Sequence, residues 1–113
     1  MSDIEIRTRD KDGARILDVN GQLDSHTAYR LEEQIQASIA AGQPRLVVNL
    51  RQVEYLSSAG MGAMLKYLNV ARSANGDIKL SNLPDRIDAL MRSVGLAAAL
   101  EIYQFEEEAL ARF

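Results

Sequence analysis

The sequence predicts an α/β fold with a mixed β-sheet of four to five strands and about four helices, in the order β-β-α-β-α-β-α-(β)-α. Residues 46–50, LVVNL, form an almost continuous apolar run, which is typical of a central strand buried on both faces. Segments with alternating apolar residues are interleaved with segments that show helical spacing. The chain has 113 residues and is 47% hydrophobic, so we expect a single domain over residues 1–113 with one sizeable core.

The first two strands are expected to form a hairpin. Ile4 and Ile6 alternate with charged residues, which indicates a half-exposed edge strand. Residues 11–13, Lys-Asp-Gly, supply turn chemistry, because Gly13 accepts a positive φ without steric strain. The apolar residues between 16 and 19 then form the partner strand.

The first helix is predicted to follow residues 21–25. Asp24 or Ser25 is its expected N-cap, because short polar side chains accept hydrogen bonds from the free N–H groups of a first turn. Gly42 and Pro44 end the helix before the central strand. Its buried stripe is expected to consist of Ala28, Leu31, Ile35 and Ile39.

A second helix is predicted to begin at Ser57-Ser58 and to be closed by Asn75-Gly76. It contains apolar residues at helical spacing after the two serines. Ile78 and Leu80 then alternate with polar neighbours and indicate a further strand.

The last third of the chain is expected to hold a helix, a short strand and a terminal helix. Pro84 suits the first position of the third helix, because its missing N–H has no partner there, and Gly95 ends that helix. Residues 100–103 form the short strand, and residues 106–113 form the terminal helix, with the glutamates at 106–108 solvated in its first turn. The predicted buried face of the third helix is Ile87, Leu90, Met91 and Val94.

The composition excludes several kinds of site. The net charge is −3, from 13 Lys and Arg against 16 Asp and Glu, which argues against a nucleic-acid or anionic-membrane surface. There is no Cys, and His26 is the single His, so neither a metal site nor another cofactor is expected. No apolar run approaches the roughly 20 residues of a transmembrane helix. Residues 1–5 are not typical of a secretory signal, so a cytoplasmic protein is expected.

Two loops are candidates for the functional site. Residues 22–25 and 54–58 each follow a strand of the predicted parallel part of the sheet. Binding sites in such sheets lie at the carboxyl ends of the strands, so we expect the two loops to lie side by side.

Ser57 and Ser58 have two interpretations. Each suits an ordinary N-cap, and each also suits a phosphoacceptor, because the positive end of a helix tolerates a phosphate. Phosphorylation would add about −1.5 to −2 charges on the same backbone, which suits a binding switch. Gly60 and Gly62 indicate either tight packing of the helix on its strand or close approach of a partner. Met61 is either a core residue or a partly exposed apolar anchor.

Enzymatic interpretations fit the sequence poorly. Ser58, His26 and Asp24 have the side chains of a hydrolase triad, but a nucleophile elbow needs a glycine two residues before the serine, where Leu56 stands. A phosphate-binding loop would need Lys followed by Ser or Thr after its last glycine, and Gly62 is followed by Ala and Met. No catalytic residue is therefore predicted.

Several segments together resemble one known family. The most specific is Leu-Ser-Ser-Ala-Gly-Met-Gly at residues 56–62, and others are Gly-Gln-Leu-Asp at 21–24 and the strand at 46–50. Asn-Leu-Pro at 82–84 and Val-Gly-Leu at 94–96 add to the match. On these segments, and over essentially its whole length, the chain resembles the bacterial anti-sigma factor antagonists, which are small single-domain STAS proteins. The resemblance implies a STAS-like mixed sheet.

The resemblance also implies a phosphorylation switch. In this family an anti-sigma factor with a histidine-kinase-like ATPase fold is also a serine kinase, and it phosphorylates the serine that corresponds to Ser58. The unphosphorylated antagonist binds the anti-sigma factor and releases its sigma factor, and a PP2C-type phosphatase restores that form. Many members have Asp just before the acceptor, where this chain has Ser57, so Ser57 is the alternative acceptor.

A partner-binding surface follows from the same resemblance. Its expected residues are Asp24, Ser25, Ser57, Ser58, Gly60, Met61 and Gly62. An alternative within the family is a STAS module without phosphorylation, which would serve a transport, lipid-trafficking or signalling-scaffold assembly.

Overall fold

A computed structural model describes residues 3–113, so Met1 and Ser2 of the predicted domain and N-terminal segment lie outside it. Five strands form one sheet in the order β1-β2-β3-β4-β5, with β1 antiparallel to β2 and all other pairs parallel. This confirms the predicted mixed α/β fold. The elements are β1 (Ile4–Lys11), β2 (Ala14–Leu23), α1 (Ala28–Ala40), β3 (Arg45–Leu56), α2 (Ser58–Lys66), α3 (Leu68–Ser73), β4 (Asp77–Ser81), α4 (Asp85–Ser93), a 3₁₀ helix (Leu96–Ala98), β5 (Glu101–Tyr103) and α5 (Glu106–Leu110).

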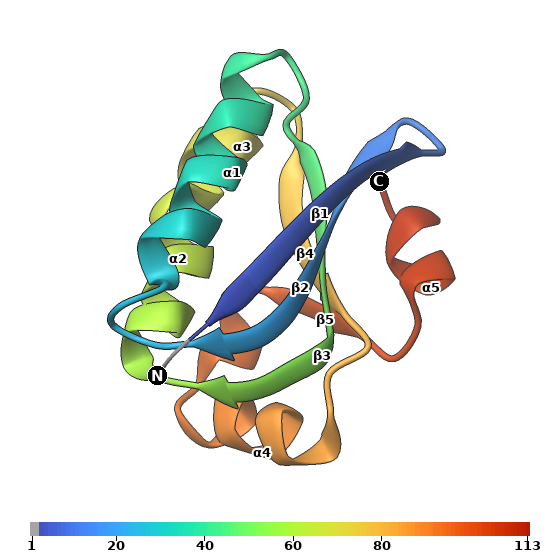
Figure 1. The fold of residues 1–113 in the computed structure, drawn as a ribbon. Coiled ribbons are helices and arrows are strands. Elements are labelled where there is room, and N and C mark those ends of the chain that lie inside the picture. The colour runs from blue at the N-terminus through green and yellow to red at the C-terminus, as the bar shows by residue number, and fades with distance from the viewer. Residues whose placement is uncertain (1–2) are drawn as a thin grey trace.

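The helices lie unevenly on the two faces of the sheet (Figure 1). Helices α1, α2 and α3 stand together on one face, and α4 joins the same apolar core through Ile87 and Met91. The short helix α5 lies on the opposite face, over a smaller apolar cluster. The rest of that second face is not covered by any helix of residues 3–113 (Figure 1). The smaller cluster consists of Ala14, Ile16, Val47, Ala109 and Leu110.

The predicted hairpin and edge strand are confirmed. Asp12 and Gly13 both have positive φ, 53° and 78°, which matches a two-residue turn whose twist follows that of the strands. The pairing of Lys11 with Ala14 then sets the register of the whole β1–β2 ladder. Strand β1 is outermost in the sheet, as its alternating sequence indicates.

The central strand is longer than predicted. Residues 46–48 and Leu50 are buried, as expected, but β3 continues to Leu56 with exposed polar residues among its last six. This extension is possible because β2 pairs with β3 along nearly its whole length, up to the pair Leu23–Leu56. An apolar run in the sequence predicts only the part of a strand that is buried on both faces of the sheet.

Strand β4 differs from expectation in burial, because all five of its residues are buried. Lys79, which alternates with apolar residues in the sequence, is 3% exposed. Its ammonium group donates to Asp77 (3.0 Å) and Glu101 (2.8 Å) and lies 4.9 Å from the ring centre of Phe113. A buried lysine is tolerated here because two carboxylates pair with it.

Several helix boundaries correct the sequence-based expectations. The N-cap of α1 is Thr27 instead of Asp24 or Ser25. Pro84 is the N-cap of α4 and does not occupy its first helical position. The helix expected up to Asn75-Gly76 is divided into α2 and α3, because Tyr67 has φ −107° and ψ 11°, outside the helical range.

The apolar stripe of α4 is only partly buried. Ile87 and Met91, one turn apart, face the core, whereas Leu90 and Val94 are exposed, contrary to the prediction. The reason is that α4 lies at the end of the sheet, so only one narrow side of it meets the core (Figure 1). Gly95 does end the helix, in the left-handed conformation with φ 81°.

Candidate functional site

The two predicted loops meet at the carboxyl edge of the sheet. Leu23 and Leu56 are paired at the ends of β2 and β3. The backbone N–H of Ser57 donates to the carbonyl of Leu23 over 2.8 Å, so the last residue of β2 is bonded to the residue just before α2. The expectation that these loops lie side by side is confirmed.

Ser57 and Ser58 have different environments, although they are neighbours in the sequence. Ser57 is half-buried and is the N-cap of α2, and its hydroxyl oxygen accepts from the N–H of Gly60 over 3.4 Å. Ser58 is the first helical residue and is exposed, and its side chain has no hydrogen-bond partner among residues 3–113. One hydroxyl therefore caps the helix, and the other is presented to solvent at its positive end.

The neighbouring loop is held by a reciprocal set of hydrogen bonds. Asp24 is only 9% exposed, and its Oδ1 accepts from the N–H groups of His26 (2.8 Å) and Thr27 (3.2 Å). The buried Thr27 hydroxyl donates to the carbonyl of Gln22 (2.6 Å) and accepts from the N–H of Asp24 (3.0 Å). Asp24 therefore shapes this loop, and Ser25 and His26 form its exposed tip.

The two glycines of α2, Gly60 and Gly62, differ in how closely other residues pack around them. A β-carbon on Gly60 would lie 2.9 Å from the carbonyl oxygen of Leu23 and 2.8 Å from a methyl carbon of Leu56. Gly60 is therefore required by the close packing of α2 on β2 and β3. Gly62 is exposed, and no atom of residues 3–113 outside its own helix backbone lies within 4 Å of the corresponding position, so there is open space where a side chain would stand. Met61, between them, is half-buried against the core.

Among residues 3–113, no hydrogen bond joins the hydroxyl of Ser58 to the His26 ring, a contact that the nucleophile and base of a hydrolase would make. Oδ1 of Asp24 bonds the backbone N–H of His26, so that oxygen serves the turn. Within residues 3–113, no group of three or more His, Cys, Asp or Glu side chains is placed to hold a metal ion. No helix in this part of the chain is long and apolar enough to cross a membrane.

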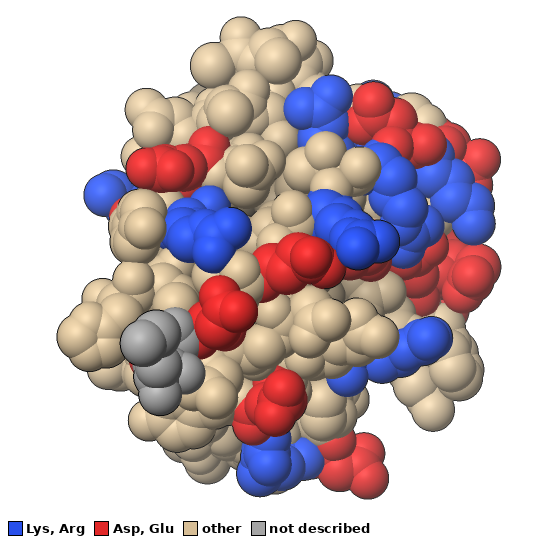
Figure 2. Space-filling model, in the orientation of Figure 1, with Lys and Arg blue, Asp and Glu red and all other residues tan. Residues whose placement is uncertain are grey.

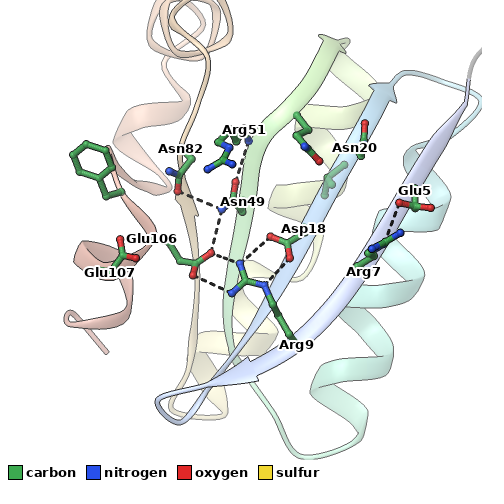
Figure 3. A pocket seen from close by; sticks show the side chains of 13 residues that line it. Glu5, Arg7, Arg9, Asp18, Asn20, Asn49, Arg51, Asn82, Glu106 and Glu107 are labelled. Carbon is green, nitrogen blue, oxygen red and sulfur yellow. Dashed lines mark hydrogen bonds and ion pairs between the residues drawn. The ribbon is translucent and has the colours of Figure 1, made fainter.

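A polar groove of about 790 Å³ lies on the second face of the sheet, beside the start of α5 (Figure 3). At its floor Arg9 binds Asp18 through two hydrogen bonds, 2.6 and 3.0 Å long. Arg9 also pairs with Glu106 of α5, 3.1 Å from Nη1 to Oε2. Asn49 donates to Glu106 over 3.1 Å and to Asn82 over 3.3 Å. This network attaches α5 to strands β1, β2 and β3.

The sequence-based interpretation of Glu106 was therefore wrong, since this residue is 7% exposed instead of solvated. Burial by itself would raise the pKa of Glu106, but hydrogen bonds from Arg9 and Asn49 outweigh it and lower the pKa below its usual value. Counting the hairpin register outward from the turn places Arg7 opposite Asp18 and Arg9 diagonally across from it, so the sequence offers two arginines as the partner of Asp18 and does not decide between them. Glu106 has no comparable local signal.

We expect Glu106→Gln to lower the free energy of unfolding at pH 7 by about 1–2 kcal/mol, because the charged hydrogen bonds to Arg9 are weakened. The pKa of Glu106 is lower in the folded than in the unfolded state, so the charged carboxylate stabilises the fold above the ordinary pKa of Glu. This stabilisation is lost as pH falls below about 4.5. Urea denaturation should therefore show a difference between wild type and variant that shrinks on acidification. Exposed Glu107→Gln is the matched control, and equal losses in both variants would contradict the assignment.

Charges of both signs are interspersed on the face that carries the edge strand β1 (Figure 2). Several belong to ion pairs, among them Arg15–Asp10 (2.8 Å) and Arg7–Glu5 (3.1 Å). Exposed pairs of this kind contribute little stability. Their alternating signs do not create the one-signed surface that attracts a polyanion.

Comparison with known proteins agrees with this geometry. The profile of the STAS domain matches residues 5–109. The chain belongs to the STAS domain family. This STAS domain is 30% identical over 105 residues to the anti-sigma-B factor antagonist of Listeria monocytogenes, covering 93% of this chain and 91% of the relative. The predicted resemblance is thereby confirmed.

Solved structures show the same fold as this STAS domain. An anti-sigma factor antagonist from Mycobacterium paratuberculosis is 28% identical, with a TM-score of 0.75 over 96% of this chain and 92% of the other. SpoIIAA of Bacillus, in its phosphorylated form, is 20% identical, with a TM-score of 0.72 over 96% of this chain and 98% of the other. By their names, the antagonists among these relatives are regulatory binding proteins.

Proposed function

We propose that this STAS domain is an anti-sigma factor antagonist controlled by phosphorylation at Ser58. In the proposed mechanism the unphosphorylated chain binds an anti-sigma factor, which then releases its sigma factor. The observation that carries the proposal is the exposed hydroxyl of Ser58 at the first position of α2, which has no hydrogen-bond partner in the described part of the chain. The names of the relatives support an anti-sigma factor as the partner.

The proposed partner is an anti-sigma factor with a histidine-kinase-like ATPase fold, which is also the serine kinase. In the kinase reaction the γ-phosphoryl group of ATP passes to the Ser58 oxygen, the hydroxyl proton is lost, and ADP leaves. A PP2C-type phosphatase would hydrolyse the phosphoserine and restore the binding form. We place these steps in the cytoplasm and assign this chain no catalytic activity of its own.

The geometry around Ser58 supports it over Ser57 as the acceptor. The Ser57 hydroxyl is half-buried and accepts from the N–H of Gly60, so it is less accessible to a kinase than the exposed hydroxyl of Ser58. A phosphate on Ser58 would stand in solvent, beside the free N–H groups of the first turn. It would therefore change the charge of the surface and leave the backbone in place.

The test is to map phosphate on protein purified from its own host, with and without phosphatase treatment. Intact mass should show a single phosphate that treatment removes, and fragmentation should place it on Ser58. Ser58→Ala should abolish the modified species, while Ser57→Ala should retain it. Phosphate on Ser57, or a chain that is never modified in growing or stressed cells, would contradict the proposal.

A further inference from the structure

Tyr29 is a large, partly apolar side chain exposed in the first turn of α1. It is 55% exposed, although it follows directly after the buried Ala28. Single exposed apolar side chains are common on soluble proteins and need no explanation by themselves. What distinguishes Tyr29 is its position relative to α2.

Two contacts show which side of α1 carries Tyr29. Arg30 reaches the edge strand, where its Nη1 donates to the carbonyl of Ile4 over 2.7 Å. On the other flank, Glu32 pairs with Lys66 of α2, with 3.7 Å between the charged atoms. Residues three apart share a helical stripe, so Tyr29 lies on the flank of Glu32, which is turned toward α2.

The direction of the helices puts Tyr29 and Gly62 at corresponding positions of α1 and α2. Helices α1 and α2 pack against each other, and both start at the carboxyl edge of the parallel strands, so they run in the same direction (Figure 1). One helical turn before Glu32 lies Tyr29 on α1, and one turn before Lys66 lies Gly62 on α2. Gly62 has open space above it, one turn after Ser58. Tyr29 and Gly62 therefore both lie near the starts of the two helices, at the end of the α1–α2 pair where Ser58 stands.

We infer that Tyr29 is an aromatic anchor for the anti-sigma factor, and that the docking surface extends from Ser58 across Gly62 onto α1. This inference rests on the proposed function. Tyrosine offers a large contact area with few rotatable bonds, and such residues dominate the energetics of protein interfaces. The open space at Gly62 lets a partner approach the flank of the ring closely. The occupant is the partner that contacts Ser58, because Tyr29 and Ser58 both stand in the first turn of two helices that pack together and run in the same direction.

The inference is tested by calorimetry with a purified kinase-fold anti-sigma factor from the same organism. Tyr29→Ala should raise the dissociation constant about tenfold or more, as expected for truncating an anchor. Tyr29→Phe keeps the ring and should stay within about threefold of wild type if the ring area provides the affinity. Val70→Ala is the matched control, because Val70 is 50% exposed on α3 and lies outside this surface.

The outcomes separate this inference from the proposed function. If Ser58→Asp abolishes binding while Tyr29→Ala binds like wild type, the docking surface does not include α1 and only this inference fails. If the unmodified chain binds no such anti-sigma factor, both proposals fail. Melting temperatures of all variants should match wild type, because the replaced side chains are exposed. A loss of affinity in Val70→Ala equal to that in Tyr29→Ala would also overturn the inference.

Discussion

Ser58→Asp is expected to weaken binding to the anti-sigma factor about a hundredfold or more, while Ser58→Ala keeps the affinity of the unphosphorylated chain. The carboxylate would have to leave water when the partner covers the start of α2, and an unpaired buried charge costs several kcal/mol. The same carboxylate is favourable in the free protein, because Ser58 stands at the positive end of a nine-residue helix. The variant should therefore fold normally and lose only binding.

Isothermal calorimetry of the two variants against one partner preparation measures this difference. Ser73→Asp is the control for added charge, because Ser73 is exposed at the end of α3, away from the predicted surface. It should bind like wild type. Equal affinities of Ser58→Asp and Ser58→Ala would rule out a charge switch at this position.

Gly60→Ala is expected to lower the free energy of unfolding by about 3 kcal/mol, the upper end of the usual range for an overpacked site. The added methyl group would meet the Leu23 carbonyl oxygen at 2.9 Å, and this backbone atom is held by the pairing of β2 with its two neighbouring strands. The strain also falls on the β2–α2 contact that places the two loops side by side. The substitution should therefore impair partner binding as well.

Gly62→Ala is the matched comparison for stability, since both glycines lie in the same helix. With no atom within 4 Å of the new methyl group, it should stabilise the fold by up to about 1 kcal/mol through helix propensity. Urea denaturation of both variants gives the difference directly. A Gly60→Ala protein as stable as wild type would show that α2 does not need this close approach.

Features with local signals were predictable. The turn at Asp12-Gly13 is predicted by residue types that accept a positive φ. The strand at 46–50 is predicted by its apolar run. The junction at Ser57-Ser58 follows from two hydroxyls placed between a strand and a helix. Each of these signals depends on a few consecutive residues, and the structure confirms all three.

Features that depend on what covers a segment were not predictable. Leu90 and Val94 continue an apolar stripe in the sequence, yet at the end of the sheet they stay 36% and 54% exposed. The sequence indicates that Glu106 is a solvated acid, yet Arg9 and Asn49 of the sheet donate hydrogen bonds to it. In both cases the deciding partner, or its absence, lies far away along the chain.

By itself, the sequence determined the alternation of strands and helices, the hairpin, and the pair of serines at the start of α2, because hydrophobic period and turn chemistry act between near neighbours. Only the tertiary structure decided that Ser57 caps the helix while Ser58 faces solvent, that Gly60 is needed for packing while Gly62 is open, and that Tyr29 is exposed in the first turn of α1. The physical reason is that exposure is a property of contacts between distant segments, which no local pattern encodes.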